Sequence, residues 1–304
     1  MSQQKTRVSK LYRDRYLIML ALPALILTIL FCYLPMSGII MAFQNYMVRK
    51  GLFGSEWVGL KHFKSFFSSI YAGRVIKNTI VLSSLNLLFG FLTPILFALL
   101  LNELRCTPFK RIVQTVSYLP HFVSTVVVVG MLVSFFNPSF GLINVIRSKL
   151  GLNTIAYMSD PKWFRPLYVG SEVWQHFGWN SIIYISAMAG IPQEMYEAAE
   201  IDGAGRFKQA IFVTVPSLMP TIITLLILNC GWLFSMGYEK VILMYSPSNY
   251  EVADIISSYV YRRGILNSEF SFSTAIGLMN SLLNTAILIG VNAVSKKVNG
   301  ISIF

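Results

Sequence analysis

Long apolar stretches without charged residues constrain this chain more than any other feature. Three of them, residues 16–43, 78–102 and 209–238, contain no Asp, Glu, Lys or Arg. A helix that crosses the hydrocarbon core of a bilayer needs about 20 predominantly apolar residues, because lipid cannot satisfy exposed backbone groups. Each stretch is long enough to form such a helix, so we expect an integral membrane protein.

Three further stretches bring the predicted spans to six. Residues 112–146 are also uncharged, and we expect that span to end at Phe136. Residues 270–295 form the last span, whereas residues 166–191 contain a single charged residue, Glu172. The predicted fold class is therefore an all-α polytopic membrane protein with six transmembrane helices.

The distribution of basic residues predicts which side of the membrane holds the termini. Six spans place both termini on one side, and the basic N-terminal tail together with Lys296 and Lys297 favours the cytoplasm. Residues 44–77 depart from this rule, since they carry six Lys or Arg against one Glu and lie outside in this topology. The net charge of +12 is spread over loops, where anionic lipid headgroups attract it, and no nucleic-acid recognition module is visible. We expect a multi-pass protein of the cell membrane that does not bind nucleic acid.

Two short segments have the pattern of amphipathic helices. Residues 59–72 and 142–150 carry apolar side chains at helical spacing beside Lys or Arg. This pattern predicts helices that lie against membrane lipid at the outer surface.

A charged loop between the fourth and fifth spans carries the most specific pattern. Good helix formers fill residues 193–201, and Gly203 and Gly205 then permit a sharp reversal of the chain. A second short helix is expected to follow until Pro216 opens the next span. The loop at 193–212 is therefore predicted to be a helix–turn–helix on the cytoplasmic face, with charged side chains available to a partner.

This loop resembles a motif of a known family. Glu197-Ala198-Ala199, then Gly203, then Val213-x-Val215-Pro216 is similar to the EAA loop of binding-protein-dependent ABC importer permeases, although the two valines stand where Ile and Leu are common. In that family the loop is a coupling helix that docks into a cleft of the ATP-binding subunit. The resemblance implies that Glu197 pairs with a basic residue there and that Gly203 makes the turn. The residues assigned to ATPase coupling are Glu197, Ala198, Ala199, Asp202, Gly203, Gly205, Arg206 and Pro216.

The N-terminal third is similar to a subgroup of these permeases. Leu22-Pro23-Ala24-Leu25, Tyr33-Leu34-Pro35 and residues 57–63 resemble the LplB-type permeases, which belong to the carbohydrate uptake group of the MalF and MalG subunits. Asn78-Thr79 matches a recurrent start of the permease core. The resemblance implies a type I ABC importer permease fold in four parts. These are a cytoplasmic tail at 1–15, a first transmembrane helix with an external amphipathic segment at 16–73, a permease core at 74–295 that contains the 193–212 loop, and a cytoplasmic tail at 296–304.

The resemblance also implies a function and a set of partners. The chain is identified as the permease subunit of an ATP-driven carbohydrate importer that moves an oligosaccharide or polysaccharide fragment delivered by an extracellular binding protein. It would form a heterodimer with a second homologous permease and work with two copies of an ATPase that hold ATP and Mg²⁺. Two alternatives stay open: the same permease role for a non-sugar solute, and a secondary transporter.

Several catalytic signatures are missing from the sequence. No Walker A loop and no hydrolase or metalloprotease motif occurs, so we expect no enzymatic activity and no cofactor on this chain. The three cysteines, Cys32, Cys106 and Cys230, give neither a disulfide framework nor a metal-ligand spacing.

Polar side chains inside the predicted spans indicate a substrate pathway. Such groups are costly in lipid, so they usually face the protein interior or a water-filled cavity. Amides bond the hydroxyl groups of sugars and aromatic faces cover the apolar face of a pyranose, although Asn and Gln also hold helices together. The pathway residues proposed on this basis are Glu172, Trp174, Gln175, His176, Trp179, Asn180, Asn229, Trp232, Asn280 and Asn284.

Overall fold

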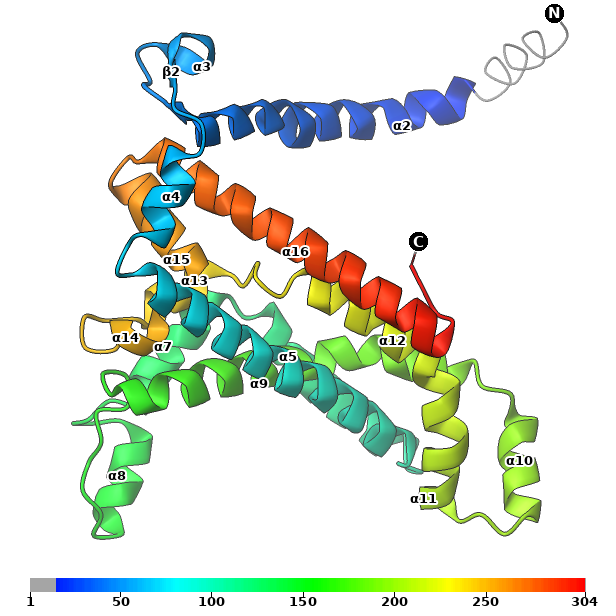
Figure 1. Ribbon diagram of the computed structural model, residues 1–304. Helices are drawn as coiled ribbons and strands as arrows, with labels where there is room; N and C mark the ends of the chain where they lie inside the picture. Colours follow the sequence, from blue (N-terminus) through cyan, green and yellow to red (C-terminus); the bar gives the residue numbers. More distant parts are fainter. Residues whose placement is uncertain (1–14, 304) are drawn as a thin grey trace, which may run out of the picture.

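The computed structural model describes residues 15–303, and helices dominate them (Figure 1). The only strands in this range are β1 (Gln44–Asn45) and β2 (Glu56–Trp57), which pair antiparallel with Gln44 opposite Trp57. The described part of the chain is therefore all-α in substance, as predicted. The prediction for the basic tail at 1–14 lies outside the described residues.

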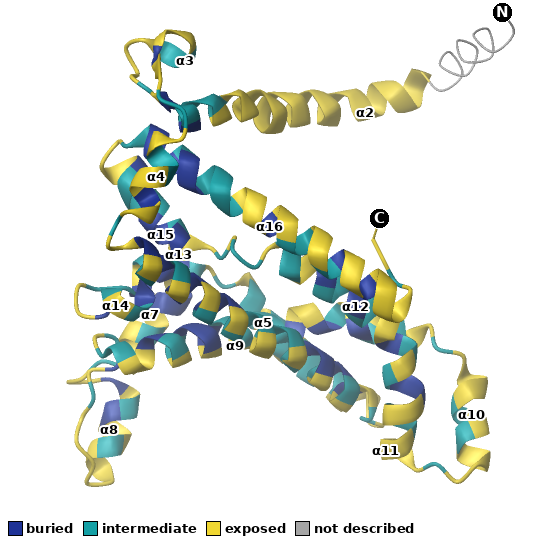
Figure 2. Ribbon diagram, viewed as in Figure 1, coloured by how far each residue is buried: buried dark blue, intermediate teal, exposed yellow. Residues whose placement is uncertain are grey.

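The first long helix stands apart from the others. It runs through α2 (Arg15–Thr28), a π-helical turn η1 (Ile29–Tyr33) and a 3-10 segment η2 (Leu34–Phe43). None of the 18 residues in its most apolar window is buried, and Figure 2 shows α2 exposed along its whole length. Its contacts with the rest of the chain are concentrated in η2, which packs on α16 (Phe270–Asn299).

Short helices gather at one end of the molecule, which we call the cap end (Figure 1). A buried aromatic cluster around Phe66, Tyr259 and Phe272 packs two of these short helices, α4 and α15, against the start of α16. Two helices of the cap end, α4 and α8, lie within the segments predicted at 59–72 and 142–150. The helices of the cap end are α3 (Gly51–Gly54), α4 (Lys61–Phe67), α8 (Leu142–Lys149), α13 (Tyr238–Met244), α14 (Tyr250–Ala253), α15 (Ile256–Tyr261) and the π-helical turn η5 (Arg262–Leu266).

Long helices run from the cap end to the opposite end, which we call the loop end. α5 (Ala72–Asn102) packs along α9 (Pro161–Ala189), and α12 (Val215–Gly231) packs on both and on α16. Near the loop end, Ile95, Tyr184 and Leu218 form a buried cluster that joins α5, α9 and α12. This packing leaves a space between the three helices nearer the cap end.

The predicted third span is not a single helix. α6 (Thr107–Tyr118) continues through η3 (Leu119–Phe122), and α7 (Thr125–Phe135) follows at an angle of 99°. The break lies at Val123 and Ser124, directly after the 3-10 turn that contains Pro120, a residue with no backbone N–H to continue the helical hydrogen bonds. Ser124 then starts the new helix, because its Oγ accepts a hydrogen bond from Val127 N at 3.4 Å.

Within residues 15–303, four helices are long and apolar enough to cross a membrane: Arg15–Phe43, Ala72–Asn102, Arg206–Gly231 and Phe270–Asn299. The bent pair of α6 and α7 makes a fifth if it counts as one span. α9, predicted as the fourth span, is long enough at 29 residues, but its many polar side chains keep it out of this group.

The fifth predicted span differs at both ends. α11 (Arg206–Gln209), the π-helical turn η4 (Ala210–Thr214) and α12 form one helix of 26 residues, so Pro216 does not open a new helix. In the π-helical turn the N–H of Val215 bonds to the carbonyl of Ala210, five residues back. The backbone hydrogen bonds in this turn already join residues five apart, not four apart, so the helix tolerates the missing N–H of Pro216. The helix then ends at Gly231, seven residues before the predicted boundary at 238.

Candidate coupling loop and translocation cavity

The segment with the family-like motif forms a helical hairpin at the loop end. α10 (Gln193–Ile201) and α11 are separated by a tight turn in which Gly203 has a left-handed backbone with φ of +77°. Ala204 N donates to Ala199 O at 2.8 Å, which closes the last turn of α10. A residue with a Cβ is strained in this conformation, so the turn requires glycine. Figure 1 shows α10 and α11 at the same end as the start of α2 and the last turn of α16.

Most of the predicted coupling residues lie on the surface of this hairpin. Ala199 is half-buried and the others are exposed: Glu197, Ala198, Asp202, Gly203, Gly205, Arg206 and Pro216. Two apolar side chains that sequence reasoning missed lie beside them, since Ile201 is 87% exposed and Phe207 79%. Lone apolar residues among charged ones are a weak signal in a sequence. In the structure they join Glu197 on a surface that a partner could cover.

Polar contacts fix the hairpin to the long helices. Tyr196 Oη lies 3.0 Å from Thr214 Oγ1, and Gln209 Nε2 donates to Ala204 O at 3.0 Å. Arg206 reaches the end of α5, where its guanidinium lies 3.8 Å from the carboxylate of Glu103. These contacts join the hairpin to the end of α5 and to the helix that continues into α12.

A cavity of about 230 Å³ lies between α5, α9 and the end of α12. On α9, Glu172, His176 and Asn180 are spaced four residues apart, which puts them on one face of the helix. Asn229 and Trp232 close the cavity from α12. A second cavity of about 120 Å³ lies beside it toward the loop end. The residues that line both are Gly90, Phe91, Asn180 and Asn229.

Charged and ring groups form a chain along the cavity wall. Lys240 is 4% exposed, and its Nζ lies 2.7 Å from Glu172 Oε2. His176 Nε2 lies 3.4 Å from Glu172 Oε1, and its Nδ1 lies 3.1 Å from Nδ1 of His121. The His121 ring stacks on Trp179 with centroids 4.4 Å apart. Glu172 is therefore a cavity carboxylate with an ammonium group behind it.

Five of the ten predicted pathway residues line this cavity and five do not. Gln175 is buried and donates from Nε2 to Val123 O at 2.8 Å, at the break between α6 and α7. Asn280 and Asn284 bond to the backbone of Phe234, at 2.8 and 2.9 Å, just beyond the end of α12. These amides satisfy backbone groups that the helix breaks leave free. Trp174 faces α7 in a separate apolar pocket.

Sequence reasoning missed the α5 side of the cavity and its lysine. Ser83 and Asn86 line the cavity, and Ser83 Oγ and Asn86 Oδ1 are buried with no hydrogen-bond partner among the described residues. Tyr168 also lines the cavity, one turn before Glu172 on α9. Hydroxyl and amide groups inside the uncharged stretch 78–102 were a usable signal. Lys240 lies beyond the predicted span, so no sequence pattern pairs it with Glu172.

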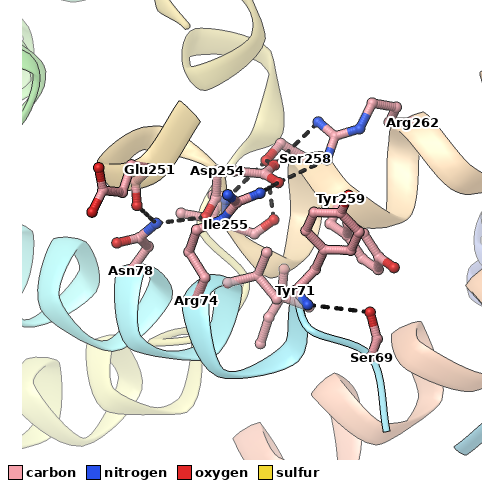
Figure 3. Close-up of polar contacts among 12 residues, drawn as sticks. Ser69, Tyr71, Arg74, Asn78, Glu251, Asp254, Ile255, Ser258, Tyr259 and Arg262 are labelled. Atoms are coloured by element: carbon pink, nitrogen blue, oxygen red, sulfur yellow. Dashed lines mark hydrogen bonds and ion pairs between the residues drawn. The ribbon is translucent and has the colours of Figure 1, made fainter. Parts of the chain in front are cut away.

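A buried carboxylate organises the cap end (Figure 3). Asp254 is fully buried, and its oxygens accept from Arg262 at 2.7 and 3.2 Å and from Ser258 at 2.8 Å. Arg74 of α5 approaches to 3.9 Å. Burial opposes the charge of Arg262, but the hydrogen bonds and charge of Asp254 outweigh it and raise the pKa of that guanidinium.

Asn78 and Thr79 of α5 form hydrogen bonds with the backbone of residues 251–256, the segment that contains Asp254. Asn78 Nδ2 donates to the carbonyls of Glu251 and Asp254 at 2.8 and 3.1 Å, as Figure 3 shows. Thr79 Oγ1 accepts from the N–H of Ile256 at 2.9 Å. This explains physically why an Asn-Thr pair stands near the start of α5, since both side chains satisfy backbone groups of a segment about 175 residues away in the chain.

Comparison with known proteins gives three consistent results. The model of the family described as "Binding-protein-dependent transport system inner membrane component" matches residues 90–300. Protein LplB of Bacillus subtilis (strain 168) is 43% identical over 290 residues, which cover 95% of this chain and 91% of that protein. The polygalacturonan/rhamnogalacturonan transport system permease protein YteP of the same organism is 41% identical, over 97% of this chain and 92% of its own.

A solved structure matches over almost the whole chain. It is a chain from the crystal structure of a bacterial alginate ABC transporter in complex with an alginate pentasaccharide-bound periplasmic protein. The identity is 38% and the TM-score 0.90, and the match covers 97% of this chain and 99% of that one. The helical architecture described above is therefore that of an ABC importer permease.

Proposed function

Because the chain belongs to the inner membrane components of binding-protein-dependent transport systems, we propose that it carries an oligosaccharide or polysaccharide fragment across the cell membrane. It is a multi-pass transport subunit and not an enzyme. The names of its relatives support a carbohydrate cargo, since they refer to polygalacturonan, rhamnogalacturonan and alginate. The coupling loop alone leaves a non-sugar solute open. The amide groups and Trp232 in the cavity favour a sugar.

The hairpin of α10 and α11 is the observation that carries this proposal. It is exposed, it presents Glu197 beside Ile201 and Phe207, and it continues without interruption into α12. α12 is also a wall of the cavity. A partner that moves the hairpin therefore moves a cavity wall, which is the mechanical requirement for ATP-driven alternating access. A secondary transporter would have no use for such a loop.

The partners proposed for this chain are those of an ABC importer. Two ATPase chains, which hold the ATP and Mg²⁺, dock on hairpins such as α10–α11. A second homologous permease completes the pathway, and an external binding protein delivers the sugar to the cap end. The unburied α2 supports a permease partner, because a helix that packs only at one end has a face available to another subunit.

The proposed topology has six spans and both termini in the cytoplasm. Counting the bent α6–α7 pair as one span and adding α9 to the four apolar helices gives six. α9 is less apolar because its polar side chains face the cavity and neighbouring backbone, not lipid. The shared end of α10, α11, the start of α2 and the last turn of α16 supports a cytoplasmic location for the termini.

Uptake into vesicles tests the proposal. The chain is reconstituted with its neighbouring permease, ATPase and binding protein, and ATP-dependent uptake of labelled oligosaccharides is measured for Glu197→Lys. We expect the variant to lose at least about 90% of uptake, because the reversed charge faces the ATPase at a surface where like charges repel. Glu239→Lys, an exposed acid on α13 at the cap end, is the matched control and should retain uptake.

Two results would contradict the proposal. Uptake that persists without the ATPase would point to secondary transport. Uptake that is unaffected by Glu197→Lys and by Gly203→Pro, in complexes that still assemble, would exclude the hairpin as the coupling element.

A further inference from the structure

The described residues that line the cavity between α5, α9 and α12 include a carboxylate but no Lys or Arg. We propose that Glu172 makes this cavity selective for a neutral, hydroxyl-bearing sugar unit over a uronate, and that Lys240 positions the Glu172 carboxylate. The inference rests on the proposed function, because it names the class of sugar unit that occupies this point of the pathway.

The charges of the cavity oppose an anionic ligand. No Lys or Arg is among its described lining residues, and its ionisable lining groups are Tyr168, Glu172 and His176. The nearest ammonium, that of Lys240, lies behind the wall and is already paired with Glu172 at 2.7 Å. A uronate carboxylate would enter a partly desolvated space beside a negative charge with no cation left to pair it.

The uncharged polar groups favour hydroxyl donors. Ser83 Oγ and Asn86 Oδ1 are buried and lack hydrogen-bond partners among the described residues. Asn229 uses one N–H of its Nδ2 for Leu225 O at 2.8 Å, which leaves its oxygen and the second N–H for the cavity. The Glu172 carboxylate and the amide oxygens of Asn86 and Asn229 are acceptors, and the Ser83 hydroxyl both donates and accepts. A sugar hydroxyl donates to such groups, whereas an ionised carboxylate offers only acceptors.

Lys240 fixes the direction of the Glu172 side chain. It reaches in from α13, passes over the ring of Tyr168 with its Nζ 5.3 Å from the centroid, and holds Oε2. His176 approaches the other oxygen, Oε1, from the next turn of α9. The carboxylate is therefore held between two side chains at the cavity wall. Lys240 acts through Glu172 and does not line the cavity itself.

A matched pair of monosaccharides tests the selectivity. Methyl galactoside and methyl galacturonide share every ring centre and differ only at C6, which bears a hydroxymethyl group in one and a carboxylate in the other. Ligand-observed saturation-transfer NMR measures their dissociation constants on the complete importer in nanodiscs, with the binding protein left out. The wild type should bind the galactoside at least about tenfold more tightly, the scale of one charge-assisted hydrogen bond.

Glu172→Gln should abolish or reverse this preference, because it removes the negative charge and leaves the Lys240 ammonium free for the uronate. Glu172→Gln/Lys240→Met removes both charges, and its preference should fall between those of the wild type and the single variant. The double variant carries the test if the unpaired lysine prevents the single variant from assembling. Glu239→Gln, on α13 but exposed and outside the cavity, should keep the wild-type preference.

The selectivity is overturned by any of three results: equal binding of both probes to the wild type, the absence of a signal from both, or a preference that does not change when Glu172 is replaced. Each can occur while ATP-dependent uptake by the same complex remains intact. Loss of uptake specificity for sugars would instead refute the proposed function. The two failures are therefore distinguishable.

Discussion

A charge that is fully removed from water must be paired, and Asp254 is paired more than once. Its two oxygens receive both ends of the Arg262 guanidinium, and Ser258 supplies a third donor. Removing one partner of a buried pair costs far more than the pair itself contributes, since the charge left behind has no solvent. At the scale of single residues, Asp254 is therefore where the cap end is most vulnerable.

We expect Asp254→Ala to destabilise the protein by about 3 kcal/mol, the lower end of the range for breaking a buried pair, because both arginines still reach solvent. Thermal unfolding of the purified complex in detergent should show a clear fall in Tm. Glu251→Ala is the matched control, because the Glu251 side chain is exposed and only its backbone carbonyl is bonded by Asn78. Equal Tm values for the two variants would refute a structural role for the Asp254 cluster.

Neighbouring polar residues on α9 have different roles. His176 lines the cavity, whereas Gln175, about 100° away around the helix, bonds to the backbone at the α6–α7 break. The sequence identifies both as polar residues in a span. It cannot say which face meets α5 or α6, because that depends on packing with helices far away in the chain. Glu172, His176 and Asn180 could be predicted to share a face from their spacing alone.

Helix breaks are the element-scale feature that hydropathy does not report. The apolar run at 112–136 is predicted to be one span, yet a bend at Val123 and Ser124 divides it into α6 with η3 and α7. Pro216 shows the opposite behaviour. It is predicted to mark a helix boundary, but it lies inside a continuous helix, directly after a π-helical turn. A proline removes one hydrogen bond in either setting. Whether the chain bends depends on how neighbouring groups are satisfied. At the α6–α7 break the N–H of Val127 bonds to Ser124 Oγ, and Gln175 from α9 donates to the carbonyl of Val123.

Close contact between α6 and α9 depends on one missing side chain. A Cβ on Gly178 would lie 2.1 Å from the backbone oxygen of Ser117, which is a severe clash. Gly178→Ala should force the helices apart and destabilise the protein by roughly 1–3 kcal/mol. Gly170→Ala on the same helix meets nothing within 4 Å and should be neutral or slightly stabilising. The Tm of both variants is measured by thermal unfolding. A Gly178→Ala protein with the Tm of the wild type would show that the contact between α6 and α9 is not tight.

At the scale of the whole molecule, function divides between two ends. The cap end is made of short helices tied together by Asp254, Asn78 and Thr79, while the loop end presents the α10–α11 hairpin (Figure 1). The sequence predicts the hairpin well, because a local motif of helix formers and glycines encodes it. It predicts the cap end poorly, because the contacts that build it join α5 to residues about 175 positions away.

Cysteine labelling tests the proposed orientation of these two ends. In a background without Cys32, Cys106 and Cys230, single cysteines replace Lys149 on α8, Lys208 on α11 and Lys297 on α16, all of them exposed. A membrane-impermeant maleimide added to intact cells should label Lys149→Cys only. Lys208→Cys and Lys297→Cys should react only after the membrane is opened. Labelling of Lys149→Cys and Lys208→Cys from the same side would exclude the six-span topology.

The continuous helix from Arg206 to Gly231 works as a connecting rod. About 20 residues separate Gln209, at the hairpin, from Asn229, at the cavity, which corresponds to about 30 Å along the helix axis. When a helix of this length tilts as a rigid body, a small tilt moves its far end by several ångströms. The motion then reaches the cavity through the helix itself, without changes in side-chain contacts along the way. The displacement at the cavity then depends on where the helix pivots, and the cluster of Leu218 with Tyr184 and Ile95 is the packed point nearest its middle.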